Sequence, residues 1–270
     1  MEMKKKRMNT KLKYFFGVFI SLPLLPFLYF QGKKIKRAVP KLPEAKEPKG
    51  YVNGNFKNTL KILSIGESTI AGVGVEFHKN GFTGALANTL SKELQSNINW
   101  RVYARSGYTV LQVCKKIIPK IEEKTTDLIV IGMGGNDAFT LNSPRNWIKG
   151  TQNLINLLQL KFPGTPIFFT NMPPIKEFPA FTKPIKFVIG NLVEVLGARL
   201  HLLINNKSNV YYSNEVITLK EWSQRNALPT NNAKIYFSDG VHPSELTYNV
   251  WGKEMGLFIK SKLNNTTDLY

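Results

Sequence analysis

The chain of 270 residues has one cysteine, three histidines, and 18 acidic side chains against 37 basic ones. A single cysteine cannot form a disulfide within the chain, and the apolar periodic stretch around Cys114 predicts a buried, inert thiol. Neither an HExxH nor a CxxC spacing occurs, so we expect no transition-metal site and no cofactor. The phosphate-binding loop GxxxxGK, followed by Ser or Thr, is also absent.

Positive charge is concentrated near the N-terminus. Residues 1–49 contain 13 Lys and Arg but 3 Asp and Glu, which is more than half of the formal net charge of +19. A basic chain can bind nucleic acid by releasing phosphate counterions, but the rest of the sequence has no zinc-finger spacing, RNP-like motif or basic helix. Attraction to anionic lipid explains the cluster more simply, so we expect no nucleic-acid partner.

An uncharged apolar stretch, YFFGVFISLPLLPFLYF, occupies residues 14–30 between Lys- and Arg-rich flanks. Its length is at the short limit for crossing about 30 Å of hydrocarbon. Pro23 and Pro26 would kink or break a helix there, so shallow or re-entrant insertion stays open. No small-x-small cleavage site follows, which favours retention over signal-peptide removal. We predict a membrane-anchor segment over residues 1–37, with the side of the membrane left open.

The remaining sequence divides into a linker and one domain. Residues 38–58 are rich in Pro, Gly, Lys and Asn and predict a linker, and residues 59–270 are predicted to form one globular domain. Strands are expected at 60–66, 99–105, 126–134, 165–171 and 209–214, and helices at 81–95, 108–123, 144–160, 184–204 and 244–263. This alternation predicts an α/β/α sandwich with a five-stranded parallel sheet, which binds ligands beyond the carboxyl ends of its strands.

Ser68 is the first candidate for chemistry. The motif GESTIAG, residues 66–72, follows the first predicted strand and places this serine in a glycine-flanked turn at the carboxyl edge of the sheet. From this motif alone, a nucleophile and a plain turn with a capping serine are equally good interpretations. The motif is not the GxSxG elbow of α/β-hydrolases.

A hydrolytic serine needs a base, and His242 fits best among the three histidines. It lies in the motif SDGVHP, three residues after Asp239, with Gly240 allowing a tight turn. The Asp239 carboxylate can then orient the imidazole and stabilise its protonated form. The alternative is an Asp-Gly turn with a chance histidine. His78 is expected at the surface, and His201 is expected as a partly buried structural residue of a helix.

Two further loops carry donors for a developing oxyanion. GGND, residues 134–137, follows the third predicted strand, and the Asn136 side-chain amide can donate. The Gly107 turn follows the second strand, and its amide N–H is free to point into the cleft. The carboxyl ends of parallel strands share one edge of the sheet, so we expect these donors to converge near Ser68.

Together, GESTIAG, the Gly107 turn, GGND and DGVHP resemble, in order and spacing, the four blocks of the SGNH hydrolases, also called the GDSL lipase/esterase family. The resemblance covers nearly the whole predicted domain. It implies a flavodoxin-like three-layer α/β/α fold with Ser68 as nucleophile, His242 as general base and Asp239 as orienting acid. It also implies an oxyanion hole made by the Ser68 amide, the Gly107 amide and the Asn136 side chain.

One position departs from the family pattern, because Glu67 stands where aspartate usually precedes the serine. We expect altered local hydrogen bonding there rather than lost activity. The expected activity is hydrolysis of a carboxylic ester, including lipid esters, through an acyl-enzyme on Ser68. A membrane-bound O-acetyl transferase or deacetylase acting on sugars, and a catalytically silent ligand-binding module, are the alternatives. The natural ester and the oligomeric state stay open.

Overall fold

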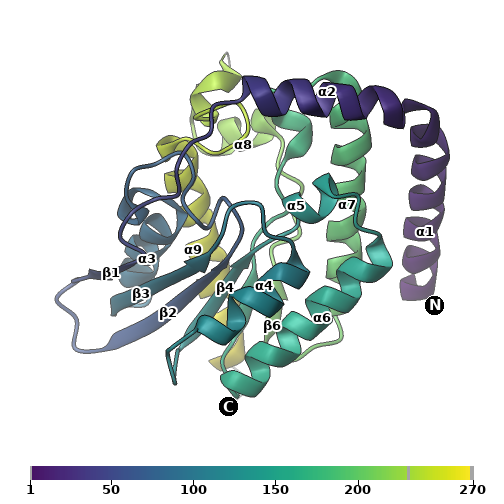
Figure 1. Ribbon diagram of the computed structural model, residues 1–270. Coiled ribbons are helices and arrows are strands. Elements are labelled where there is room, and N and C mark those ends of the chain that lie inside the picture. The colour runs from purple at the N-terminus through teal and green to yellow at the C-terminus, as the bar shows by residue number, and fades with distance from the viewer. Residues whose placement is uncertain (1, 230–231, 268–270) are drawn as a thin grey trace.

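A six-stranded sheet lies between two layers of helices in the computed structural model, which describes residues 2–229 and 232–267 (Figure 1). The strand order is β1-β3-β2-β4-β5-β6, and every neighbouring pair is parallel except β1 and β3. The strands are β1 Lys49–Val52, β2 Thr59–Gly66, β3 Asn97–Ala104, β4 Leu128–Gly132, β5 Ile167–Phe169 and β6 Val210–Tyr212. The five predicted parallel strands and the predicted three-layer α/β fold are confirmed.

Helices α3 and α9 pack together on one face of the sheet, while α4, α6 and α7 cover the other (Figure 1). The helices are α1 Glu2–Ser21, α2 Leu25–Ala38, α3 Phe82–Glu93, α4 Val110–Lys116, α5 Gly135–Phe139, α6 Pro144–Lys161, α7 Lys183–Ile204, α8 Leu219–Arg225 and α9 Glu245–Thr267. Helix α6 begins at Pro144 because Ser143 caps it, its hydroxyl accepting the Asn146 N–H at 3.2 Å.

The centre of the sheet is apolar on both faces. All five residues of β4 are buried, and Ile129, Val130 and Ile131 are wholly inaccessible to solvent. A parallel strand covered by helices on both sides requires such a continuous apolar run. Burying these side chains stabilises the scaffold from which the loops at the carboxyl edge extend.

The segment predicted as a linker, residues 38–58, is attached to the domain over part of its length. Strand β1 lies within it and pairs with β3 as an antiparallel edge strand. The Ala45 and Lys46 amides also donate to the carbonyls of Ala71 and Glu76, at 2.9 and 2.8 Å. A composition rich in Lys and Pro is typical of linkers and also of edge strands, where it discourages further pairing. The linker prediction is therefore wrong for β1.

The N-terminal apolar stretch forms two helices rather than one. Helix α1 ends at Ser21, and the single turn Leu22–Leu24, which contains Pro23, separates it from α2. The two helices are bent by 79° at this break, as the prolines predicted. Figure 1 shows α1 beside α7 and α2 across the end of the molecule. Met1 and residues 268–270, the ends of the predicted anchor and domain, lie outside the described residues.

Length and composition alone do not identify a membrane span here. Helix α7 is long and apolar enough, with a mean hydropathy of 1.6, but half of its apolar window is buried inside the protein. The bent N-terminal pair meets the same test only as a broken span or re-entrant loop. Membrane association therefore stays a proposal.

Candidate active site

The candidate site lies at the carboxyl ends of β2 and β4, which are neighbours in the sheet although β3 separates them in the sequence. The chain therefore leaves these two strands in opposite directions, and this is where doubly wound sheets open a crevice for ligands. Ser68 follows β2, and the loop beginning at Met133 follows β4. Gly66 and Gly132 lie opposite each other in the register, so both loops start at the same level.

Ser68 stands at the start of a tight helical turn and is partly exposed. The Ala71 amide donates to the Glu67 carbonyl at 2.8 Å, and the Val73 amide donates to the Ser68 carbonyl at 3.1 Å. The turn needs glycine before it, because a Cβ at Gly66 would lie 2.3 Å from the Gly132 carbonyl oxygen. The strand thus ends abruptly, and the serine is held at the edge of the sheet.

Asp239 and His242 form a hydrogen-bonded pair in the loop before α9. The imidazole Nδ1 lies 2.7 Å from Asp239 Oδ2, while Asp239 Oδ1 accepts the amides of Val241 at 2.9 Å and His242 at 2.7 Å. The aspartate side chain is fully buried, and 21% of the histidine side chain is exposed. Burial alone would raise the pKa of Asp239, but the hydrogen bonds from His242 outweigh it and hold that pKa below its usual value.

The loop that carries His242 is attached directly to the turn that carries Ser68. Ser238 Oγ donates to the Gly74 carbonyl at 3.1 Å, and the buried Tyr248 hydroxyl donates to the Val73 carbonyl at 2.8 Å. Thr69, which follows Ser68, and Val241, which precedes His242, line the same apolar cavity of about 40 Å³. Within the described part of the chain, no hydrogen bond joins the Ser68 hydroxyl to the His242 ring.

The predicted oxyanion donors come from loops that touch one another. The Asn136 side-chain amide donates to the Tyr108 carbonyl at 3.2 Å, which brings the loop after β4 against the Gly107 turn. Gly107 has a φ of +82° and is exposed. Neither its amide nor the Ser68 amide donates a hydrogen bond within residues 2–229 and 232–267. Both N–H groups are thus available for a ligand.

Glu67 is a buried carboxylate that joins the Ser68 turn to the loop after β4. The Gly135 amide donates to its Oε1 at 2.7 Å, and the Asn136 amide donates to its Oε2 at 2.9 Å. Burial raises the pKa of Glu67 to about 7, against the lowering effect of these two bonds. The residue that departs from the family pattern therefore fixes the backbone that carries the Asn136 donor.

Asp137 plays a similar part on the other side of the same loop. It is fully buried, and its carboxylate accepts the Val110 amide at 2.9 Å and the Asn142 side-chain amide at 2.7 Å. Burial raises the pKa of Asp137 as well. The role of Asp137 could not be predicted from the sequence, where its one signal is an acidic residue five positions after the strongly apolar strand β4.

Glu67→Gln is expected to alter the pH dependence of stability. Because burial raises the pKa of Glu67 from 4.5 to about 7, the folded protein holds this proton more tightly than the unfolded chain does. Wild-type stability therefore falls as the pH rises through that window, and the amide variant escapes this loss. The free energy of unfolding of Glu67→Gln, relative to that of wild type, should therefore rise by about 3 kcal/mol between pH 4.5 and pH 8.

Urea denaturation of both proteins at several pH values measures this difference. A gap between the two free energies of unfolding that is constant with pH would contradict the assignment. At pH 8 the turnover of Glu67→Gln should be lower than that of wild type. Glutamine offers one acceptor oxygen to the two amides of Gly135 and Asn136. The donor loop then loses one of its two anchors.

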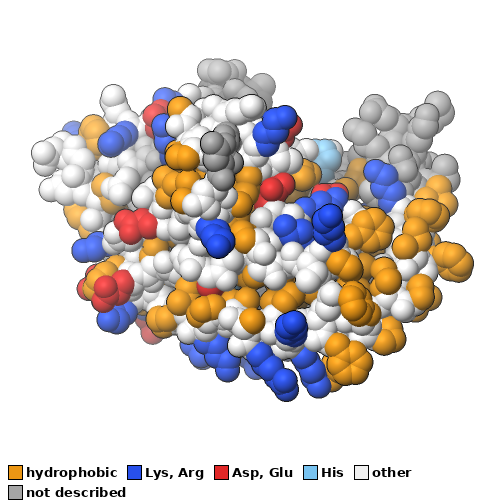
Figure 2. All heavy atoms as spheres, turned by 90° about the horizontal axis from the view of Figure 1, so that it is seen from above, with side chains coloured by type: hydrophobic (Ala, Val, Ile, Leu, Met, Phe, Trp, Pro, Cys, Tyr) orange, Lys and Arg blue, Asp and Glu red, His pale blue; other side chains and the backbone are white. Residues whose placement is uncertain are grey.

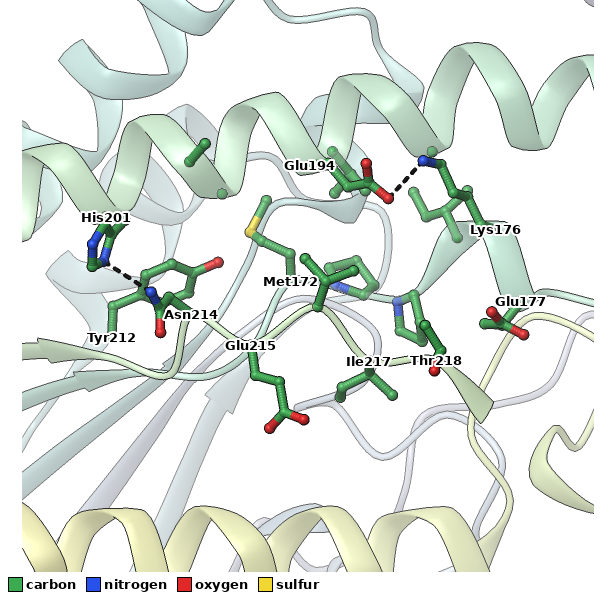
Figure 3. A pocket seen from close by; sticks show the side chains of 18 of the residues that line it. Met172, Lys176, Glu177, Glu194, His201, Tyr212, Asn214, Glu215, Ile217 and Thr218 are labelled. Atoms are coloured by element: carbon green, nitrogen blue, oxygen red, sulfur yellow. Dashed lines mark hydrogen bonds and ion pairs between the residues drawn. The ribbon is translucent and has the colours of Figure 1, made fainter. Parts of the chain in front are cut away.

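A larger cavity of about 430 Å³ adjoins the small one, with Pro173, Pro174 and Ile217 lining both. Figure 3 shows it beneath α7, with Met172 and Tyr212 at its inner side. Lys176 pairs with Glu194 at 2.7 Å across its rim. The two cavities thus share part of their lining, and together they present both apolar and polar side chains beside the candidate site.

The apolar residues of the loops after β4 and β5 have different places in the structure. Pro173, Pro174 and Phe178 line the small cavity, and Met172 lines the larger one. Met133 is instead buried in the core.

The other candidate side chains lie apart from this site. His78 was expected at the surface but is buried, which lowers its pKa to about 4, because its turn packs under residue Lys46. His201 lies on α7 between Asn205 and Asn214, at 3.1 and 3.2 Å, in keeping with its predicted structural role. Cys114 is buried as predicted. Among the described residues, no group of three or more His, Cys, Asp or Glu is arranged to hold a metal ion.

Comparison with known proteins gives matches to one family. A sequence model of the GDSL-like lipase/acylhydrolase family matches residues 64–250. None of the curated proteins compared with the chain matches it.

Solved structures share the fold at low identity. A family 3 carbohydrate esterase from Clostridium thermocellum has a TM-score of 0.55 and 20% identity, over 76% of this chain and 99% of that one. A lipase from a goat rumen metagenome has a TM-score of 0.51 and 19% identity, over 73% and 95%. A psychrotrophic esterase from Pseudoalteromonas has a TM-score of 0.51 and 16% identity, over 76% and 98%.

Proposed function

The chain belongs to the GDSL-like lipase/acylhydrolase family, and on that premise we propose that it hydrolyses carboxylic esters with Ser68 as nucleophile. One observation carries the proposal. A buried Asp239 lies 2.7 Å from the His242 ring, in a loop bonded to the turn that holds Ser68. An oriented imidazole beside a serine at a sheet edge is the arrangement that acyl transfer requires.

In the proposed cycle, His242 Nε2 accepts the Ser68 proton as Ser68 Oγ attacks the ester carbonyl carbon. Asp239 holds Nδ1 in the correct tautomer and stabilises the imidazolium. The tetrahedral intermediate collapses to an acyl-enzyme, and His242 donates its proton to the departing alkoxide, which leaves as the alcohol. Water then attacks the acyl carbon with its proton taken by His242, and the acid leaves as Ser68 regains its proton.

Charge on the carbonyl oxygen develops where three donors meet. We assign these to the Ser68 and Gly107 amides and the Asn136 side-chain amide. The first two make no hydrogen bond within the described residues, and the third is held by its bond to the Tyr108 carbonyl. Donors already in position stabilise the oxyanion without rearranging during the reaction.

The donor loop is also held in place from two sides. Glu67 and Asp137 anchor it through buried carboxylates on backbone and side-chain N–H groups, so the loop keeps its shape as charge develops beside it. The apolar cavity of about 40 Å³ between Thr69 and Val241 gives the ester a place for its acyl group. The adjoining cavity of about 430 Å³ leaves room for a larger second part of the substrate.

Asn136→Ala tests the oxyanion assignment. Removing one side-chain donor is expected to lower kcat on p-nitrophenyl acetate by about 10²–10³-fold with little change in KM, because the bond matters most in the transition state. Asn146→Ala is the matched control, since Asn146 is an exposed asparagine on α6. A loss of less than about threefold in the Asn136 variant, with its thermal unfolding unchanged, would remove Asn136 from the site.

A further inference from the structure

Large apolar side chains lie exposed along the N-terminal helices. Figure 2 shows them gathered at one end of the molecule, next to an edge where Lys and Arg side chains are numerous. The exposed members on α1, α2 and the turn between them are Leu12, Phe15, Phe16, Val18, Phe19, Leu22, Phe27, Tyr29 and Phe30. Single exposed apolar residues are common on soluble proteins, but a contiguous set of this size marks a surface that another apolar phase covers.

The apolar surface continues onto the catalytic domain. Leu141, which follows α5, and Phe187 on α7 are 48% and 46% exposed. They line a pocket of about 230 Å³ together with Val18 and Leu22 of the N-terminal segment. The two parts of the chain, more than 100 residues apart in sequence, therefore present one continuous apolar face.

Leu141 has an unfavourable backbone for its side chain. Its φ is +53°, in the left-handed region that glycine and asparagine adopt more readily. A leucine in this conformation that is still 48% exposed gains little from burial within the described part of the chain. Its side chain is better explained by a contact outside the protein.

The shape of this surface favours binding along a bilayer rather than across it. Helix α1 packs against α7 of the domain, and the Thr182 hydroxyl donates to Gln31 Oε1 at 2.6 Å, which ties α2 to the same domain. A segment bent by 79° and attached on one side cannot be surrounded by lipid while this arrangement holds. Helices of this kind lie in the interface with one face in the acyl chains.

Positive charge borders the apolar face. Among the residues of these elements whose side chains are described, the exposed basic ones are Lys13, Lys33, Lys34, Arg37 and Lys183. Each cation close to an anionic membrane adds to the attraction. Apolar residues bordered by Lys and Arg are typical of surfaces that bind anionic lipid, whereas a protein partner would be expected to bring its own complementary acidic groups.

A row of aromatic rings leads from this face to the candidate active site. Phe139, 40% exposed, contacts Phe181 with 5.5 Å between ring centroids, and Phe181 contacts Phe178 at 5.4 Å. Phe178 lines the small cavity beside Thr69 and Val241. Contacting aromatic rings thus extend from α5 to the small cavity beside the candidate ester site.

We propose that the N-terminal helices, Leu141 and Phe187 form one lipid-facing surface that lays the protein along an anionic bilayer, so that its ester site meets membrane-borne esters. The part of this statement that concerns esters rests on the proposed function. The part that concerns the surface does not.

The double variant Leu141→Asn with Phe187→Gln tests the surface. Flotation with vesicles of phosphatidylcholine containing phosphatidylglycerol should show binding weakened by about tenfold or more, because two apolar contacts with lipid are lost. Asparagine suits the left-handed backbone at position 141, so the fold should be as stable as wild type or more so. Hydrolysis of soluble p-nitrophenyl acetate should be unchanged. The double variant Leu160→Gln with Leu257→Gln is the control, since it removes two exposed leucines from α6 and α9.

Each other outcome overturns the proposal. Unchanged vesicle binding in the Leu141/Phe187 variant would mean that the N-terminal segment holds the membrane alone, as a span would. Equal loss in the control variant would mean non-specific adhesion. A dimer that the Leu141/Phe187 variant turns into a monomer, with vesicle binding unaffected, would assign the face to a second copy of the chain. Vesicle binding is measured without any ester. A wild-type protein that binds vesicles as expected but hydrolyses no ester would therefore contradict the proposed function and leave the proposed surface unaffected.

Discussion

Replacing Ser68 with alanine is expected to lower kcat on p-nitrophenyl acetate by about 10⁴-fold or more. The covalent route needs the Ser68 oxygen, and the other hydroxyl between Gly66 and Gly72, that of Thr69, belongs to a residue that lines the small apolar cavity. Substrate binding and stability should be nearly unchanged, because Ser68 is partly exposed and its side chain makes no hydrogen bond in the described part of the chain.

The control is Ser208→Ala, which removes an exposed hydroxyl from the turn before β6. It should leave kcat unchanged. Stopped initial-rate assays with matched protein concentrations and circular dichroism of each variant separate lost chemistry from lost structure. If the Ser68 variant kept more than about 1% of wild-type turnover, the nucleophile would have to be another group.

Asp239→Asn should have the second-largest effect, a loss of about 10⁴-fold in kcat. The asparagine oxygen can still accept the Val241 and His242 amides, so the loop should keep its fold. Its amide nitrogen, however, would donate to His242 Nδ1, where the carboxylate now accepts. That moves the imidazole proton to Nε2, and the base no longer has a lone pair facing Ser68.

A pH profile distinguishes this cause from simple loss of charge. If the wrong tautomer of His242 is responsible, the kcat of Asp239→Asn should recover at high pH only to the extent that hydroxide takes over the role of the base. Asp239→Ala is the companion variant, because it removes the two loop hydrogen bonds together with the orienting group and should lower the free energy of unfolding as well. Wild-type activity in Asp239→Asn would show that Asp239 has a structural role alone.

The sheet could be predicted because its strands have strong local patterns. The buried run TDLIVIGMG marks β4, and GESTIAG marks the turn where β2 ends. Strand β1 could not be predicted, because its four residues alternate weakly in burial and its composition matches that of a linker. Helices α5 and α8 are short, with five and seven residues, and tertiary contacts rather than hydrophobic periodicity hold them.

The candidate catalytic residues could be predicted from the sequence more readily than the residues that hold their loops in place. The order of the motifs indicated Ser68, Asp239 and His242, because loops at the carboxyl edge of parallel strands converge. The roles of Glu67 and Asp137 depend on amides that are distant in sequence, at Gly135 and Val110, and no local pattern shows such contacts. His78 was misplaced for the same reason, since the segment that covers it lies about 30 residues earlier.

The departure at Glu67 gives the protein a point of sensitivity that the family pattern does not contain. A buried carboxylate with a pKa of about 7 is partly protonated near neutral pH, and it holds two amides of the donor loop only when ionised. Stability and the order of the donor loop therefore respond to pH in opposite directions. The pH response of the Glu67→Asp variant can be compared with that of family members that have aspartate at this position.

If the His242 ring activates the Ser68 hydroxyl, Ser68 should react with a covalent serine-hydrolase probe. Wild-type protein is treated with a fluorophosphonate, and the modified peptide is located by mass spectrometry. We expect one adduct on Ser68, none in Ser68→Ala, and a strongly slowed reaction in Asp239→Asn. An unlabelled wild-type protein, or an adduct on a different side chain, would contradict it.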